Sequence, residues 1–351
     1  MSTLNVESIS HPTSGSNVTI NGITPASTNS LGLRNLIING AMQVAQRGTS
    51  VTGITSSGYR TVDRFRPSMG TLGTWTIEQS TDAPDGFAYS HKFTCTTADA
   101  SPAAGDDIEM EYKVEAQDLQ HLNYGSASAQ AMTLSFWVKS NKTGAATVNI
   151  LQPDNSNKSL SPTYTISSAD TWEHKTISIP GDTAGAISND NGVGLLFGWW
   201  LNSGSNFNSG TNQTTWTALD SADRNASNLG VGGAVNDYWQ ITGVQLEVGS
   251  VATPFEHRSY GDELARCQRY YAIGACILLT SIPDRYGVNI HLPCDMRTVP
   301  TITSGSIDSG SGGTIGPLND PDGGANSKRS FYQTANNSNT SGSWWKFSAE
   351  L

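Results

Sequence analysis

Apolar and polar residues alternate over short stretches through most of the chain, which is the pattern of half-buried β-strands. In the stretch 108–115, IEMEYKVE, apolar side chains fall on one face and charged side chains on the other. The stretch 132–140, MTLSFWVKS, repeats the alternation and places Trp137 on the polar face with Thr133 and Ser135. One face of an antiparallel sheet is normally wet, so we expect the charged face of 108–115 to lie in solvent.

Further strand-like runs recur at roughly regular spacing, each bounded by Gly, Pro, Asn, Asp or Ser. They include GTWTIEQ, AYSHKFTCTT, ATVNILQ, WEHKTISIP and DYWQITGVQLEVG. The run at 192–201, GVGLLFGWWL, is apolar on both faces and predicts a covered, central strand. Many short strands without intervening helical patterns predict an all-β fold, an antiparallel jelly-roll sandwich.

One stretch has helical spacing, VATPFEHRSYGDELARCQRYYA at 251–272. Ser259 and Asp262 are spaced as in a capping box, which predicts a helix from about Tyr260 to Tyr271. A helix of about twelve residues is marginal alone in water, so its apolar stripe must pack on something. Either the stripe meets its copies on the axis of a homotrimer, or it packs on its own sandwich. The stripe consists of Tyr260, Leu264, Cys267 and Tyr271.

These patterns divide the chain into four parts. Residues 1–34 are polar and turn-rich, and predict either a floppy tail or an extended arm that orders against a partner. Residues 35–256 form the predicted sandwich, and residues 257–273 form a helical joint. Residues 274–351 return to strand-like runs and predict a small C-terminal β domain, the tip of an elongated molecule.

Composition narrows the functional classes. Charged residues make up 14 % of the chain, against about 25 % in an average protein, so the surface is rich in uncharged hydrogen-bonding groups. The net charge is −10 without a basic cluster, which argues against nucleic acid or an anionic membrane as partner. No signal peptide and no apolar run of membrane-spanning length is recognised, so we expect synthesis and folding in a cytoplasm. The four cysteines lack CxxC spacing, so neither a zinc site nor a redox pair is indicated.

Several long blocks in order resemble a family of bacteriophage tail-fibre and related virion structural proteins. The blocks are NLIINGAMQVAQRG with YRTVDRF, then VEAQDLQHLNYGSASAQAMTLSFWVKSNKTG, DTWEHKTISIPGDTAG, and ITGVQLEVGSVATPFEHRSYGDELARCQRYY. The match covers about residues 35–272, and the opening MSTLNVESISHPTSGS is similar to the starts of such proteins in podovirus-like phages of aquatic bacteria. VDRF stands where ADRW is more usual, which changes packing rather than chemistry.

The resemblance implies an elongated homotrimer on the virion, made in the host cytoplasm. Its central part is similar to a carbohydrate-binding-module jelly roll. The N-terminal arm would attach to phage tail or capsid proteins, and the distal parts would meet host cell-surface polysaccharide. A structural calcium ion is common in such sandwiches, and Asn39 and Asp237 are candidate oxygen donors, near the first and last strands.

Catalysis has no positive signal in the sequence. The densest carboxylates are Asp106, Asp107, Glu109 and Glu111, and the last two lie on the face of a strand that we expect to be wet. The six histidines show no metal-binding spacing, and no nucleophile elbow, P-loop or Rossmann fingerprint occurs. We therefore expect a protein that is not an enzyme and needs no cofactor.

Sugar binding fits the aromatic content better. Lectin-like sites stack sugar faces on aromatic rings and hold hydroxyls with amide and carboxylate groups. The candidate ligand-binding residues are Trp216, Trp200 and Trp344, with Trp216 flanked by Asn and Thr in a loop-like setting. Three functions stay open: a fibre protein that recognises host glycan without catalysis, a capsid-decorating or purely structural virion protein, and a tail-associated glycan hydrolase.

Overall fold

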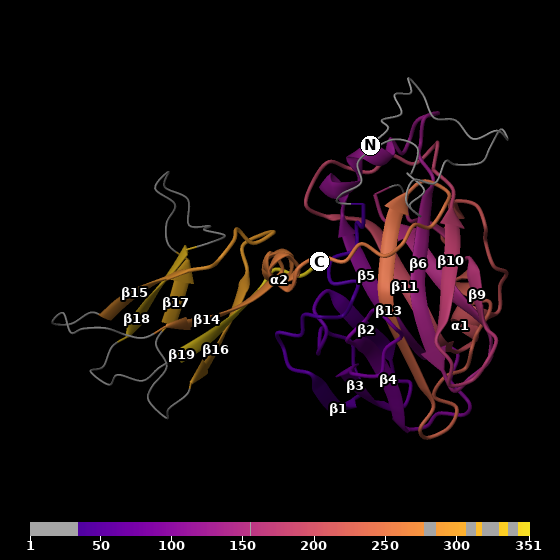
Figure 1. The fold of residues 1–351 in the computed structure, drawn as a ribbon, viewed down its shortest axis with the longest axis horizontal. Helices are drawn as coiled ribbons and strands as arrows, with labels where there is room; N and C mark the ends of the chain where they lie inside the picture. The colour runs from indigo at the N-terminus through magenta and orange to yellow at the C-terminus, as the bar shows by residue number, and fades with distance from the viewer. Residues whose placement is uncertain (1–33, 155, 277–285, 307–313, 318–329, 336–342) are drawn as a thin grey trace, which may run out of the picture.

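The computed structural model describes residues 34–154, 156–276, 286–306, 314–317, 330–335 and 343–351. Its larger part consists of two antiparallel sheets packed face to face (Figure 1). The predicted all-β antiparallel jelly-roll sandwich is thereby confirmed, because the strands pair antiparallel in two sheets and the chain crosses between the sheets several times. The N-terminal arm at 1–33 lies outside the described residues.

The first sheet has six strands in the order β1-β3-β4-β13-β6-β10. Their bounds are Ser50–Ile54 (β1), Thr74–Ser80 (β3), Ser90–Thr97 (β4), Tyr238–Val248 (β13), Met132–Ser140 (β6) and Glu173–Ile179 (β10).

The second sheet has seven strands, with the path β12-β8-β7-β11-β5-β2 and β9 paired to β7. Their bounds are Thr217–Ala218 (β12), Lys158–Leu160 (β8), Gly144–Gln152 (β7), Val193–Ser203 (β11), Asp107–Glu115 (β5), Phe65–Gly70 (β2) and Thr163–Ile166 (β9). The central position of β11 agrees with its two apolar faces. Short helices lie in the connections: η1 (Ala116–Leu122), α1 (Ser205–Asn208) and η2 (Ser221–Asp223).

The core fills the space between the sheets with the inward residues of each alternating strand. Trp75, Trp199 and Trp239 are fully buried there, and the rings of Phe136 and Trp199 meet edge to face at 5.9 Å. On β6 the four apolar side chains of MTLSFWVKS all point into this core, as the alternation predicts.

The prediction that the charged face of β5 lies in solvent is wrong. Glu109, Glu111 and Glu115 are only 2 %, 7 % and 1 % exposed. Arginines from distant segments cover them, because a carboxylate that loses its water needs an opposite charge. Arg224 covers Glu109, and Arg269 covers Glu115.

Helix α2 (Tyr260–Gln268) begins where the sequence predicts, and the Ser259 side chain accepts a hydrogen bond from the Asp262 amide at 3.2 Å. It ends earlier than predicted, and Tyr271 instead begins strand β14 (Tyr271–Cys276).

The predicted trimer stripe divides between two environments. Cys267 is fully buried and Tyr271 is 4 % exposed, with the Arg47 guanidinium 3.5 Å from the centre of the Tyr271 ring. These two residues pack within their own chain, so their assignment to a trimer interface is wrong. Tyr260 is 56 % exposed and Leu264 is half-buried, and the homotrimer stays a prediction.

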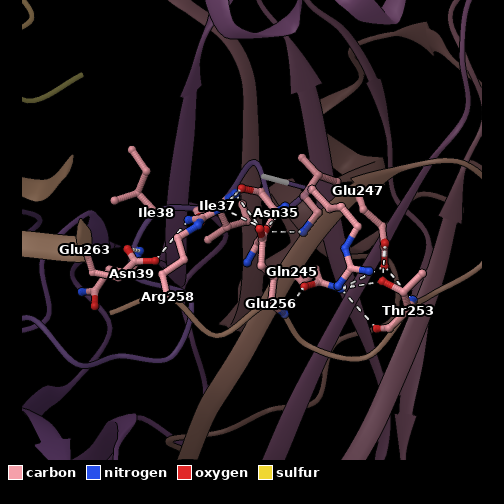
Figure 2. A network of polar contacts seen from close by, with 12 residues as sticks. Asn35, Ile37, Ile38, Asn39, Gln245, Glu247, Thr253, Glu256, Arg258 and Glu263 are labelled. Atoms are coloured by element: carbon pink, nitrogen blue, oxygen red, sulfur yellow. Dashed lines mark hydrogen bonds and ion pairs between the residues drawn. The ribbon is translucent and has the colours of Figure 1, made fainter. Parts of the chain in front are cut away.

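The segment before α2 is held to the sandwich by the polar network in Figure 2. Glu256 accepts a hydrogen bond from the Asn35 amide at 2.7 Å, and Glu247 accepts two from Thr253 at 2.7 and 2.8 Å. Arg258 donates to the Asn35 backbone carbonyl in the same network. Most of these groups are buried, so each bond satisfies a polar atom that water cannot reach. The stretch 251–263 therefore joins the first segment of the sandwich to its last strand.

The C-terminal part contains two three-stranded antiparallel sheets, β14-β19-β16 and β15-β18-β17. Their further bounds are Ser343–Ser348 (β19), Thr301–Ser306 (β16), Tyr286–His291 (β15), Ser330–Ala335 (β18) and Thr314–Pro317 (β17). This part meets the sandwich beside α2, where Glu350 forms an ion pair with Arg64 at 2.7 Å and Lys113 donates to the Leu351 carbonyl (Figure 1). The predicted domain boundaries themselves stay predictions.

Asp63 lies at this contact and makes stability depend on pH. Its carboxyl is 1 % exposed, and burial raises its pKa from 3.8 to about 7 although Arg47 and Gln46 oppose the shift. Between about pH 4 and 7 the folded chain therefore binds more protons at this group than the unfolded chain does. We expect the contribution of Asp63 to lower the free energy of unfolding as pH rises through this window, and to level off above it.

The variant Asp63→Asn, which cannot titrate, tests this expectation. Urea unfolding of both proteins at several pH values should show that the stability of the variant relative to the parent rises between pH 4 and 7. Parallel profiles across that range would contradict it.

Candidate functional site

Aromatic side chains gather on the outer side of the six-stranded sheet, where each remains partly or largely exposed. We call this surface the aromatic face. It consists of Phe87, Trp137, Trp172, His174, Phe255 and His257. Large aromatic rings are normally drawn into the core or an interface, so several of them together at the surface mark a binding site.

The alternation of β6 places Trp137 on this face. Its neighbours in the sheet are Thr242 on β13 and His174 on β10. The rings of Trp137 and His174 lie 5.2 Å apart and are tilted by 57°. The two side chains therefore form a continuous aromatic surface across the edge of the sheet.

A glycine in β13 lets the rings come close to the backbone. Gly243 has φ +60° at an irregularity in the pairing of β13 with β6. A Cβ atom at this position would lie 2.7 Å from the Phe87 ring and 3.0 Å from the Trp137 ring. Phe87 in turn packs edge to face on Phe255 at 5.0 Å. The rings of the aromatic face therefore pack closely on each other and on the backbone at Gly243.

Hydrogen-bonding groups surround Asp82 at one side of the rings. The Asp82 carboxylate accepts hydrogen bonds from Lys139 at 2.9 Å, Gln240 at 2.8 Å and Trp172 at 3.1 Å. Partial burial alone would raise the pKa of Asp82, but these three donors, Lys139 first, outweigh it and lower the pKa. Lys139 and Gln240 lie opposite each other on neighbouring strands, so the sheet itself fixes their spacing.

This arrangement offers the two contacts that a sugar needs. The partly exposed faces of Trp137 and Trp172 can cover the apolar C–H face of a pyranose ring. The ammonium group of Lys139 and the carboxylate of Asp82 can exchange hydrogen bonds with its hydroxyls, while the fully buried Gln240 holds Asp82 in place. Such a surface offers stacking and hydrogen-bonding groups that suit an extended, uncharged, hydroxyl-rich ligand.

The predicted ligand-binding tryptophans do not lie on the aromatic face. Trp200 is fully buried on the outer side of the seven-stranded sheet, between the Phe207 ring at 5.3 Å and the Arg224 guanidinium at 4.8 Å, so its assignment to ligand contact is wrong. Trp216 is half-buried, and its indole N–H donates to the Pro180 carbonyl at 2.7 Å. Trp344 lies in β19, and its side chain is outside the described part of the chain.

The predicted calcium donors serve structural bonds in two separate places. Asn39 is fully buried, and its side chain donates to two backbone carbonyls and accepts from a backbone amide. Asp237 accepts from two backbone amides and pairs with Lys142 at 3.5 Å. Gly40, next to Asn39, accepts a hydrogen bond from the Val244 amide. Val244 follows Asp237 by seven residues of extended chain, so roughly 20 Å separates Asn39 from Asp237. They cannot share one ion. The described residues contain no group of three or more His, Cys, Asp or Glu side chains placed to hold a metal.

The sequence contained a signal for the aromatic face that was not used as one. Trp137 stands on the polar side of an alternating strand, where an aromatic residue needs a reason to be exposed. Trp172 stands just before the strand-like run EHKTISI, whose first residues include His174. The contribution of Phe87 and Phe255 has no such local signal, because both come from loops.

Comparison with known proteins finds structural likeness only. No protein-family model matches the chain, and no curated protein matches it. Among solved structures, the chain is similar to the enzymatically active domain of tailspike protein 4 of bacteriophage CBA120, with 12 % identity, a TM-score of 0.33, and coverage of 61 % of this chain and 21 % of that one.

Two carbohydrate-binding modules are also similar. TmCBM61, solved with β-1,4-galactotriose, has 10 % identity and a TM-score of 0.29, and the match covers 62 % of this chain and 99 % of the module. The family 11 module of the Clostridium thermocellum cellulase Lic26A-Cel5E has 12 % identity and a TM-score of 0.28, with 60 % and 99 % covered. At these values the likenesses carry no argument about function. Among the described residues, no helix has the length and apolar character needed to cross a membrane.

Proposed function

We propose that the chain is a non-catalytic glycan-binding protein of a bacteriophage fibre, and that the aromatic face holds the glycan. The observation that carries the proposal is the pairing of partly exposed rings with the donors and acceptors around Asp82. The N-terminal arm would attach the protein to tail or capsid proteins of the virion, and the ligand class is bacterial surface polysaccharide, in accord with the fibre-like blocks of the sequence.

Binding to an array of bacterial surface polysaccharides tests this function. Trp172→Ala and Trp137→Ala should each weaken binding about tenfold, the loss expected when a central tryptophan is removed from an interface. Phe207→Ala is the matched control, because Phe207 is a partly exposed aromatic residue that packs on Trp200 at the outer side of the other, seven-stranded sheet. The control should bind as the parent does.

Two other outcomes would point elsewhere. If the parent binds no polysaccharide and labelled chains decorate the head in virion images, the protein is a structural capsid component. If polysaccharide is shortened and oligosaccharides are released, the protein is a glycan hydrolase. Equal loss in the Phe207→Ala control would also remove the aromatic face from consideration.

A further inference from the structure

A separate pocket lies at the other end of β10, beside η1. It has a volume of about 270 Å³. Its walls are Leu119, Gln120, Asn123, Tyr124, Ser126 and Ile187. Pro180 directly follows β10 and lies behind this pocket, whereas His174 of the aromatic face stands near the start of the same strand, so the two sites are distinct.

The back wall of the pocket is rigid. The Tyr124 ring is mostly buried and meets the Trp216 ring edge to face at 6.0 Å. Trp216 is itself anchored by the hydrogen bond from its indole N–H to the Pro180 carbonyl. The tryptophan that the sequence singled out for ligand contact therefore supports a residue that lines a pocket.

The opposite wall, the loop at 182–190, is also held in place. The fully buried Gln152 donates to the Gly185 carbonyl at 2.8 Å, and the Gly125 amide donates to the Asp182 carbonyl at 2.8 Å. Gly125 has φ +83°, and a Cβ there would lie 2.9 Å from the Ala186 backbone. The turn and the loop touch without space for a side chain, so the pocket exists before any ligand arrives.

The chemistry of the walls selects an uncharged ligand with an apolar side. Leu119 and Tyr124 are buried and form an apolar floor, whereas Gln120 and Asn123 are exposed at the rim. The Gln120 amide N–H groups donate to the Ala116 and Ser188 carbonyls, which turns its amide oxygen away from both. None of the six lining side chains carries a charge, so a charged ligand would lose water without gaining a partner.

We propose that this pocket binds a single neutral sugar residue, with the ring on Leu119 and Tyr124 and the hydroxyls at the amides of Gln120 and Asn123. The volume is just below the range of about 300–1,000 Å³ for drug-sized ligands, as one pyranose ring requires. This inference rests on the proposed glycan-binding function and adds a second point of recognition to it, for one residue rather than a chain.

Saturation-transfer NMR with glucose, galactose, mannose and N-acetylglucosamine tests the pocket, with glucuronic acid as the charged comparison. At least one neutral sugar should bind with a Kd of about 1 mM, and glucuronic acid should bind more weakly. Asn123→Gly should weaken binding about fivefold, as for one lost hydrogen bond. Asn123 has φ +53°, which glycine adopts without strain, so this variant keeps the turn.

The two proposals fail separately. The polysaccharide array with Trp172→Ala reports on the aromatic face, and the monosaccharide titration with Asn123→Gly reports on the pocket. The pocket proposal is overturned if no neutral sugar shows saturation transfer at about 10 mM, ten times the expected Kd. It is also overturned if Asn123→Gly, shown by circular dichroism to be folded, binds as the parent does. Gln120→Leu supplies the second variant, with the same expected loss.

Discussion

Replacing Arg224 with alanine is expected to destabilise the protein, and to do so more at high pH than at low pH. Arg224 forms an ion pair with Glu109 at 3.1 Å and also contacts Asn149 and the Trp200 ring. Glu109 is 2 % exposed, and burial raises its pKa to about 8 even though Arg224 opposes the shift. Above pH 8 the parent therefore holds a buried carboxylate that depends on this one arginine.

In Arg224→Ala the carboxyl of Glu109 has no ion-pair partner in Arg224. It must either stay protonated, which costs more free energy as pH rises, or carry an unpaired buried charge. We expect a loss of about 2–3 kcal/mol near pH 9, because ionisation of Glu109 in the parent adds only about 1.4 kcal/mol per pH unit above its pKa of about 8. Near pH 6 Glu109 is protonated in both proteins, and a loss of about 1–2 kcal/mol remains from packing and hydrogen bonds. Urea unfolding at the two pH values measures both quantities.

The double variant Arg224→Ala with Glu109→Gln isolates the cause. It should lose the pH-dependent part of the effect, because glutamine does not titrate, and keep the part due to packing. A loss that is equal at pH 6 and pH 9 in Arg224→Ala would show that the charge on Glu109 has no role.

The inner faces of the sandwich could be predicted because they depend on neighbours in sequence. Alternation alone identified Ile108 and Met110 on β5, and Phe136 on β6, as core residues, and all three are fully buried. The start of α2 could be predicted in the same way, since a cap involves residues three apart.

The outer faces could not be predicted, because the residues that cover them come from distant parts of the chain. Arg224 lies 115 residues from Glu109, so no local pattern in IEMEYKVE shows that its charged face is buried. The same holds for the aromatic face, where Gln240 and Asp82 are 158 residues apart. Trp200 was misjudged for this reason: the loop that carries Phe207 and Arg224 closes over it.

Replacing Arg64 with alanine is expected to have the second large effect, at the contact between the sandwich and the C-terminal part. Arg64 is 1 % exposed, yet its guanidinium donates to Glu350 at 2.7 Å and to the Lys113 carbonyl at 2.7 Å. The guanidinium also lies 3.4 Å from the centre of the Tyr270 ring. One side chain thus ties the segment before β2 to the last residues of the chain.

Arg64→Ala removes all three contacts and, among the described residues, leaves the Glu350 carboxylate paired with Arg47 at 3.1 Å. We expect a loss of about 3–5 kcal/mol in the free energy of unfolding, together with faster proteolysis of the C-terminal part. Arg60→Ala is the matched control, because within the described part of the chain Arg60 bonds to its neighbours Ser56 and Ser57, and the change should alter stability by less than about 0.5 kcal/mol. A double-mutant cycle of Arg64 and Glu350 should give a coupling energy of about 1–3 kcal/mol. A coupling near zero would mean that Arg64 stabilises the contact through Tyr270 and Lys113 without its ion pair.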